Sequence, residues 1–275
     1  MTGRAFRFGM VSATAESGAA WTATARRAED LGFDTLLVPD TLYTLSPFPA
    51  AAAAAATTTA LRVGTYVLSA PNRSPAQVAK ESETLHLLSD GRFELGIGAG
   101  RPGAERDAAA LGAGFGTPGE RLRRVADTIR AVRASKTPPR VLVAAGRPRM
   151  LRLAAELADT VALGLPPQTT EDELTGTVTA LRDVAGSRFD ELELHLNVAA
   201  IADDPAAVPD WVSRMVGGDP RAMAAAGGIA FLLGSADRIT DQLLRRRDAL
   251  GISYIAVNGM FAERFAPVIA RLRGR

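Results

Sequence analysis

The sequence has no cysteine and only two histidines and two lysines among its 275 residues. Without cysteine, disulfides and thiolate metal sites are excluded. With only His86 and His195 available, a histidine-based metal centre is not expected either. No apolar run approaches the ~20 residues that a membrane-spanning helix needs. The N-terminus also lacks the apolar core of a signal peptide. These absences predict a cytoplasmic protein without metal or membrane contacts.

The cationic side chains are almost all arginine. The formal net charge is only +2, yet the isoelectric point is about 9.4. A GC-rich genome explains this usage, because it favours arginine and alanine codons. The functional alternative is an anionic small-molecule partner, which the clustered Arg140, Arg147, Arg149 and Arg152 would suit. No basic tail or aromatic-studded patch indicates nucleic acid.

Strand-like and helix-like segments alternate along the whole chain, which is typical of a parallel sheet with crossover helices. Strands are expected at 6–11, 34–39, 61–68, 92–98, 140–145, 160–164, 191–201 and 253–257. Helices are expected between them, including 19–31, 119–134, 150–157, 171–185 and 236–250. Eight such strands predict a closed α/β barrel, a (β/α)8 TIM barrel, formed by residues 1–275 as one domain.

The segment 61–105 is the most informative part of the chain. It begins with an apolar strand, LRVGTYVLS, which is followed by a helix with Ser74 as N-cap and Pro75 at its first position. A second strand, RFELGIGAG, then runs into glycines, where the backbone can approach a ligand closely. Ligands bind at the carboxyl ends of parallel strands, so residues 98–105 are the first candidates for a site.

These residues closely resemble the luciferase-like monooxygenase superfamily, and within it the branch that uses the deazaflavin coenzyme F420. The resemblance rests on the Arg73-Ser74-Pro75-Ala76 helix start, on LLSDGR at 87–92, and on Gly-Ile-Gly-Ala-Gly at 96–100. Three further segments agree in the right order: RRAEDLGFDTLLVPD, VLVAAGRPRMLRLAAELADTVALG and GSADRITDQLLRRRDALGISYIAV. Together they cover most of the chain.

The resemblance implies the coenzyme-binding residues. It places a cis peptide bond between Tyr66 and Val67 beneath the coenzyme ring, and coenzyme phosphate near the glycine that opens a helix after the fifth strand. The implied coenzyme contacts lie at the ends of the second to fifth strands: Asp40, Tyr66, Val67, Ser69, Ala99, Gly100, Arg101, Ala144, Ala145, Gly146 and Arg147. Relatives are often homodimers, so a homodimer is expected.

The sequence departs from the pattern of the family in three places. Thr41 follows Asp40 where F420-dependent relatives have a catalytic histidine, and Arg101 stands where the sugar-oxidising branch has a glutamate. Only residues 135–139 separate the helix 119–134 from the next strand, where relatives carry a longer insertion. A helical segment at 205–228 replaces it elsewhere on the rim. This shortened insertion predicts an open pocket that suits a bulky or peptide-like substrate.

Proton transfer must therefore have moved to other residues, and His195, Glu105 and Tyr43 are the candidates. In ELELHLNV, Glu193, His195 and Asn197 share the face that should point into the barrel. A histidine of near-neutral pKa could deliver a proton there, although a buried structural histidine would show the same pattern.

The expected activity is reduction of an activated C=C or C=N bond by reduced F420. A natural-product intermediate such as a dehydroamino-acid residue or an imine is a conceivable substrate. Two alternatives stay open: an FMN-dependent luciferase-like monooxygenase, and a barrel that has lost its chemistry and serves as a binding protein.

Overall fold

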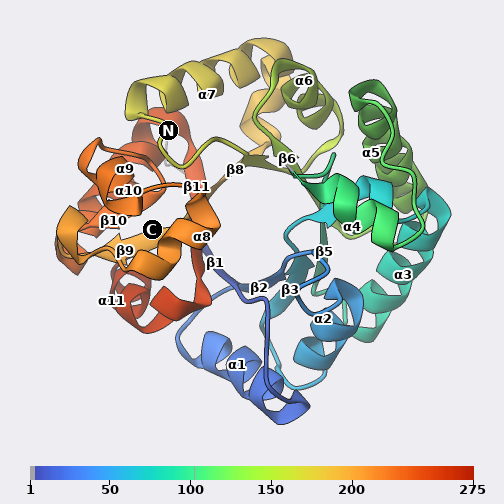
Figure 1. Ribbon diagram of the computed structural model, residues 1–275, viewed down its shortest axis with the longest axis horizontal. Helices are drawn as coiled ribbons and strands as arrows, with labels where there is room; N and C mark the ends of the chain where they lie inside the picture. Colours follow the sequence, from blue (N-terminus) through green and yellow to red (C-terminus); the bar gives the residue numbers. More distant parts are fainter. Residues whose placement is uncertain (1–3, 102) are drawn as a thin grey trace.

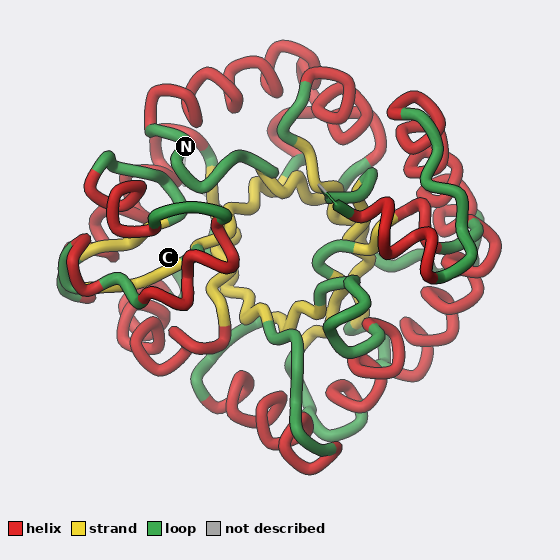
Figure 2. The backbone as a smooth tube through the Cα atoms, in the orientation of Figure 1, coloured by secondary structure: helices red, strands yellow, loops and turns green. Residues whose placement is uncertain are grey.

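The computed structural model describes residues 4–101 and 103–275. Its strands form a closed parallel barrel with helices on the outside (Figures 1 and 2). The sheet runs in the order β3-β2-β1-β11-β8-β7-β6-β5-β4, and a pairing of β3 with β5 closes it. The barrel strands are β1 (Arg7–Val11), β2 (Thr35–Val38), β3 (Arg62–Thr65), β4 (Leu68–Ser69), β5 (Phe93–Gly98), β6 (Arg140–Ala145), β7 (Thr160–Leu163), β8 (Glu193–Val198) and β11 (Ile252–Asn258). The predicted (β/α)8 barrel is confirmed.

The third barrel position is shared by two short strands, β3 and β4. β3 pairs with the start of β5 through Val63 and Phe93, and β4 pairs with its end through Leu68 and Ile97. Tyr66 and Val67 lie between the two strands, and the peptide bond that joins them is cis, as expected.

The helices surround the barrel, and several begin with side-chain caps, among them the predicted Ser74. Thr117 and Thr170 each form a capping box, in which the threonine and a glutamate three residues later satisfy each other's backbone N–H. The longer helices are α1 (Gly18–Asp30), α2 (Pro47–Ala55), α3 (Pro75–Leu88), α5 (Pro118–Arg133), α6 (Pro148–Leu157), α7 (Glu171–Ala185), α10 (Ala236–Leu250) and α11 (Ala262–Leu272). No helix in the described ranges is long and apolar enough to cross a bilayer.

The predicted strand 191–201 is wrong as a single element. β8 ends at Val198, and the next segment, β9 (Ala200–Ala202), leaves the barrel and pairs with β10 (Phe231–Leu233). The N–H of Ala199 bonds to the carbonyl of Ala230, which turns the chain away from the barrel. The alternation of apolar residues cannot show where β8 ends and β9 begins, because both strands are buried.

The expected helical segment at 205–228 contains only short helices, α8 (Ser213–Val216) and α9 (Pro220–Ala225), with 3-10 turns before them. With β9 and β10 they form one side of the rim. On the opposite side a further short helix, α4 (Ala104–Ala110), lies beside β5 (Figure 1).

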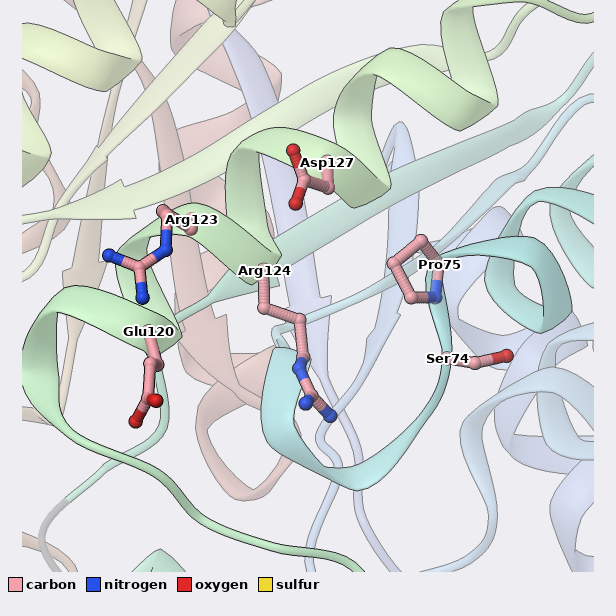
Figure 3. A pocket seen from close by; sticks show the side chains of 6 residues that line it. All are labelled: Ser74, Pro75, Glu120, Arg123, Arg124 and Asp127. Carbon is pink, nitrogen blue, oxygen red and sulfur yellow. The ribbon is translucent and has the colours of Figure 1, made fainter.

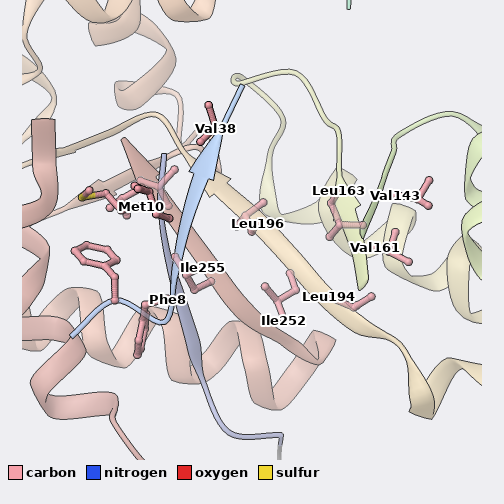
Figure 4. Close-up of a cluster of buried hydrophobic side chains, with 14 of the residues drawn as sticks. Phe8, Met10, Val38, Val143, Val161, Leu163, Leu194, Leu196, Ile252 and Ile255 are labelled. Carbon is pink, nitrogen blue, oxygen red and sulfur yellow. The ribbon is translucent and has the colours of Figure 1, made fainter. Parts of the chain in front are cut away.

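Two apolar layers hold the barrel together. The larger lies between strands and helices and includes Phe8, Val143, Leu194 and Ile255 (Figure 4). The smaller fills the barrel interior, with Tyr254, Leu37 and Leu142 as its large members. The interior is therefore a packed core, and any ligand site must lie above it, at the carboxyl ends of the strands, called the mouth below.

Candidate active site at the barrel mouth

The amino-terminal half of the barrel interior is an ion-pair network centred on Arg7. Its guanidinium donates to Glu193 and Glu94, each at 2.7 Å, and to the hydroxyl of Thr35 at 3.2 Å. Arg62 also pairs with Glu94, and Thr160 donates to Glu193 at 2.9 Å. Burial alone would lower the pKa of Arg7, but the two carboxylates outweigh it and raise that pKa above its usual value. The inward orientation predicted for Glu193 is confirmed.

Above this network lies a column of three aromatic rings. The guanidinium of Arg7 is 4.5 Å from the centre of the Tyr254 ring, which meets His195 edge-on at 4.6 Å between ring centres. His195 also contacts the ring of Tyr66, with 4.9 Å between ring centres. His195 and Tyr254 are fully buried, whereas Tyr66 is half-buried. Tyr66 is therefore the most exposed of the three rings.

His195 lies deeper than a proton donor to a substrate at the mouth would need to lie. Burial, with a smaller contribution from the charge of Arg7, lowers its pKa to about 3. The imidazole is thus neutral at physiological pH, and neither ring nitrogen has a hydrogen-bond partner in the described ranges. The side chain points inward as predicted, but it carries no proton to donate as an imidazolium.

Glycines on β5 make room for the segment between β3 and β4. A Cβ on Gly96 would lie 2.0 Å from the carbonyl oxygen of Thr65, and one on Gly98 would lie 3.0 Å from a methyl group of Val67. The hydroxyl of Thr65 binds both the N–H and the C=O of Gly96. The glycine run thus holds Tyr66 and Val67 in place at the inner wall.

Asp40 connects three elements at the mouth. Its carboxylate accepts from the N–H of Ser69 at 3.0 Å and from Arg73 at 2.6 Å. One oxygen, Oδ2, accepts both bonds. This carboxylate was expected to contact a coenzyme ring, but one of its oxygens is already engaged by the protein itself. Asp40 thereby fixes the end of β4 against β2.

Ser69 and Gly100 lie close together at the ends of β4 and β5. Ser69 is buried, and its hydroxyl finds no partner anywhere in the described chain. Gly100 has φ of +94°, and a Cβ there would lie 2.9 Å from the Phe115 ring and 3.4 Å from the Ser69 hydroxyl. Only glycine fits at this position, which leaves the serine hydroxyl beside bare backbone.

Arg101 and the residues at the end of β6 complete this side of the mouth. Arg101 is exposed and pairs with the buried Asp107 at 2.7 Å. Ala144, Ala145 and Gly146 end β6, and a Cβ on Gly146 would lie 2.1 Å from the carbonyl oxygen of Gly164. Arg147 is exposed directly before α6. This side of the mouth thus combines small residues with two exposed cations, Arg101 and Arg147.

The other two predicted proton donors lie on the outer rim. Glu105 is exposed in the first turn of α4, and Tyr43 is 85% exposed in the loop after β2. The structure does not bring either of them to His195. The structure instead indicates a further candidate site residue, Asn197 of β8. Its side-chain oxygen Oδ1 is buried without a hydrogen-bond partner in residues 4–101 and 103–275. The alternation in β8 already placed Asn197 on the inner face.

Two surface cavities of about 370 Å³ lie elsewhere. One is between the starts of α3 and α5, where Arg123 and Arg124 of α5 and Ser74 before α3 are among the lining residues (Figure 3). The other is at the amino-terminal end of the barrel and is lined by Arg7, Arg62 and Arg273 among others. Both contain acidic as well as basic side chains, so neither is a clear anion site.

The residues at the mouth fit a large anionic ring coenzyme. Ser69 and Asn197 offer unpaired polar atoms, and small residues end β5 and β6. Arg101 and Arg147 supply positive charge beside the glycines, at the start of α6 in the case of Arg147.

Curated relatives match only part of the chain. A phthiodiolone/phenolphthiodiolone dimycocerosates ketoreductase of Mycobacterium sp. (strain JLS) is 33% identical over 124 residues, which cover 36% of this chain and 32% of the relative. A Mycobacterium tuberculosis protein, classed by name as a coenzyme F420-dependent oxidoreductase, is 32% identical over 40% of this chain and 31% of its own length. The matches thus span about a third of each relative.

Solved structures share the fold over almost the whole chain. An F420-dependent secondary alcohol dehydrogenase, in complex with an F420-acetone adduct, superposes with a TM-score of 0.74 at 17% identity, covering 98% of this chain and all of the other. A riboflavin lyase with modified FMN gives 0.75 at 15% identity, covering 98% and 92%.

The model of the luciferase-like monooxygenase family matches residues 4–252. That match covers the barrel strands β1 to β8 and the ends of β4, β5 and β6 described above, so the chain belongs to the luciferase-like monooxygenase family.

Proposed function

We propose that this protein is a coenzyme F420-dependent reductase. It transfers a hydride from the reduced deazaflavin to a polarised double bond, an activated C=C or C=N, in a bulky substrate. The observation that carries the proposal is the surface at the ends of β4, β5 and β6. There an unpaired buried hydroxyl and bare glycine backbone lie beside exposed arginines.

The charges and sizes of these residues favour this coenzyme class. F420 carries a phosphate and a glutamate tail, and Arg101 and Arg147 are positioned to bind such anions. The small side chains of Ala99, Ala144 and Ala145 leave room for a flat ring system. One of the relatives and the F420-dependent secondary alcohol dehydrogenase that shares the fold are also named for F420.

When bound, the reduced coenzyme supplies two electrons and a proton as hydride, and this chain supplies position and charge. Asp40 and Arg73 hold the end of β4, which presents Ser69 to the ligand. The neutral His195 transfers no proton as an acid at physiological pH, so the proton that completes reduction comes from another group or from water. A carbonyl is the same kind of acceptor as C=N, and one matched relative is a ketoreductase by name.

Two other functions have support of their own. FMN is present in one structural neighbour, and the family is named after monooxygenases, which favours an FMN-dependent monooxygenase as the second candidate. The absent histidine after Asp40 favours a barrel that binds ligands without catalysis.

An equilibrium titration separates these functions. The protein is titrated with oxidised F420 and, separately, with FMN, and binding is followed by coenzyme fluorescence and by melting temperature. Saturable F420 binding with a raised melting temperature supports the proposal, since a ligand of the folded state must stabilise it. A preference for FMN supports the monooxygenase. If neither coenzyme changes the melting temperature, the proposal is wrong and the non-catalytic barrel is favoured.

A further inference from the structure

We infer that the substrate of this protein carries an uncharged, largely apolar group, such as an alkyl chain, and that this group binds on one side of the mouth. The residues that bind it are Leu42, Tyr43, Met215 and Met260, called the apolar arc below. This inference rests on the proposed function, because it names the class of molecule that would accept the hydride.

The exposed apolar side chains of the protein are not spread evenly. In the described ranges eight large ones are exposed, and half of them form the apolar arc. Three of the other four, Leu87, Leu88 and Val184, lie in the last turns of α3 and α7, at the amino-terminal end of the barrel. A group of exposed apolar side chains at a ligand site marks a surface that another molecule covers.

Neighbouring strands bring the apolar arc together. β2, β1 and β11 are adjacent in the sheet, and the loops after β2 and β11 carry three of its four residues. The loop after β2 is tied to the loop after β1 by the N–H of Leu45, which donates to the carbonyl of Ala13 at 2.9 Å. A Cβ on Gly259 would lie 3.4 Å from the carbonyl oxygen of Val11, so the turn after β11 packs on the end of β1.

The fourth residue, Met215, comes from the rim segment 205–228. The Trp211 ring of this segment stacks on Phe261 with 5.4 Å between ring centres, and the side-chain amide of Asn258 donates to the Met215 sulfur at 3.6 Å. The segment is therefore held against the end of β11, while Met215 itself stays 45% exposed. Thioether side chains are flexible and polarisable, so they fit apolar ligands of varied shape.

The apolar arc and the cationic side of the mouth are opposite each other. In the closed barrel β11 lies four positions from β5, and β1 lies four positions from β6, counted in either direction. The apolar arc is thus across the mouth from Arg101 and Arg147, and Figure 1 shows α8 and α4 on opposite sides of the opening. Residues 12–15, 41–46 and 258–261 contain no charged side chain.

The proposed reaction decides which molecule covers the apolar arc. The phosphate and the glutamate tail of the coenzyme require the cationic side, and the substrate is the only other ligand that hydride transfer needs at the mouth. An apolar group gains free energy when it loses its water on such a surface, whereas a charged group would lose its water without gaining a partner. The apolar arc therefore selects a substrate with an apolar body.

The test uses two neutral esters with the same activated double bond, methyl 2-butenoate and methyl 2-decenoate. The protein has no cysteine that could add to them. Each ester is titrated into the full-length protein with and without oxidised F420, whose own binding is followed by fluorescence. NMR of carbon-13-labelled methionine methyl groups reports the site. We expect the decenoate to move the resonances of Met215 and Met260, with Met150 in α6 as the internal reference.

The decenoate should also bind more than about tenfold more tightly than the butenoate, because each methylene that loses its water adds about fourfold in affinity. The double variant Met215→Gln with Met260→Gln keeps the side-chain length and removes the apolar surface. It should weaken decenoate binding about tenfold and leave F420 binding within about twofold. Leu87→Gln with Leu88→Gln, at the other end of the barrel, is the matched control and should change neither value.

The outcomes separate the inference from the proposed function. If F420 binds but the decenoate binds no more tightly than the butenoate, or moves neither methionine resonance, the inference is wrong and the proposed function stands. Equal effects of the two double variants would refute it as well. If the Met215 and Met260 resonances move with protein concentration instead, a second copy covers the apolar arc and the inference is wrong. If F420 does not bind, the proposed function fails and the inference fails with it.

Discussion

The two ends of the barrel interior treat their polar side chains in opposite ways. At the amino-terminal end, Arg7 forms ion pairs of 2.7 Å with both Glu94 and Glu193, and only the Tyr254 hydroxyl beside them is buried without a partner in the described ranges. Toward the mouth, the polar atoms of His195, Asn197 and Ser69 are buried without partners in the described ranges. Buried polar groups are normally paired, so unpaired ones in a family of enzymes mark the end where a ligand or ordered water completes the structure.

This contrast separates stability from function. Balanced charges at the closed end stabilise the barrel. Under the proposed function, the unpaired polar atoms at the mouth are kept for the coenzyme, at a cost in stability. The same division is general for (β/α)8 barrels, whose active sites lie at the carboxyl ends of the strands. The predictions below test it from the largest expected effect to the smallest.

The largest effect is expected at the closed end. Arg7→Met leaves Glu94 and Glu193 buried with too little positive charge, which should lower the free energy of unfolding by about 3–5 kcal/mol. Urea denaturation measures this. Arg140→Met is the matched control, because Arg140 approaches the same Glu193 at 3.5 Å but is largely exposed. Its removal should cost less than about 1 kcal/mol. Equal losses in the two variants would contradict the network.

A smaller effect is expected from pH, through His195. The folded protein keeps this histidine neutral down to about pH 3, whereas the unfolded chain protonates it below pH 6.5. The unfolded state therefore binds more protons in that interval, and stability falls as the pH is lowered through it. Between pH 7 and pH 5 the loss attributable to His195 is about 2 kcal/mol.

The control for the pH effect is His195→Met, which has a similar volume and no titratable group. Thermal or urea unfolding of both proteins at pH 7 and pH 5 gives the difference. Arg7, Tyr66 and Tyr254 surround the ring in both proteins, so their contributions cancel. An identical pH dependence in wild type and variant would show that His195 is not held neutral.

The smallest effect on stability is expected at Ser69. We also expect a change at Ser69 to weaken F420 binding selectively. Ser69→Ala removes a buried hydroxyl without a partner in residues 4–101 and 103–275, so stability should change by no more than about 0.5 kcal/mol. F420 should bind about tenfold more weakly if the hydroxyl contacts it. Ser82→Ala is the matched control, since Ser82 in α3 is equally buried and unpaired in those residues but lies away from the mouth. Equal F420 affinities of the two variants would remove Ser69 from the site.

The sequence predicted the barrel and one face of its site because both follow from local patterns. Alternation in ELELHLNV correctly placed Glu193 and His195 inside the barrel, and the helices predicted at 171–185 and 236–250 coincide with α7 and α10. The depth of His195 could not be predicted, because it depends on Tyr66, which lies more than a hundred residues earlier in the chain.

The other differences also come from long-range contacts. Arg7 was not recognised as a structural centre, because its partner Glu193 is 186 residues away. β9 was merged with β8, because the contact of Ala199 with Ala230 that separates them leaves no local signal. Glu105 was a candidate because it follows the glycine-rich end of the fourth strand, but the fold places both Glu105 and Tyr43 on the exposed rim.

Amide hydrogen exchange with and without saturating oxidised F420 tests the central claim most directly, because it reads both ends of the barrel in one experiment. We expect slower exchange on coenzyme binding at the ends of β4, β5 and β6, around Ser69, Gly100 and Gly146. We expect no change around Arg7, Arg62 and Glu193. Protection confined to the amino-terminal end, or none at the mouth under conditions where F420 is bound, would contradict the account.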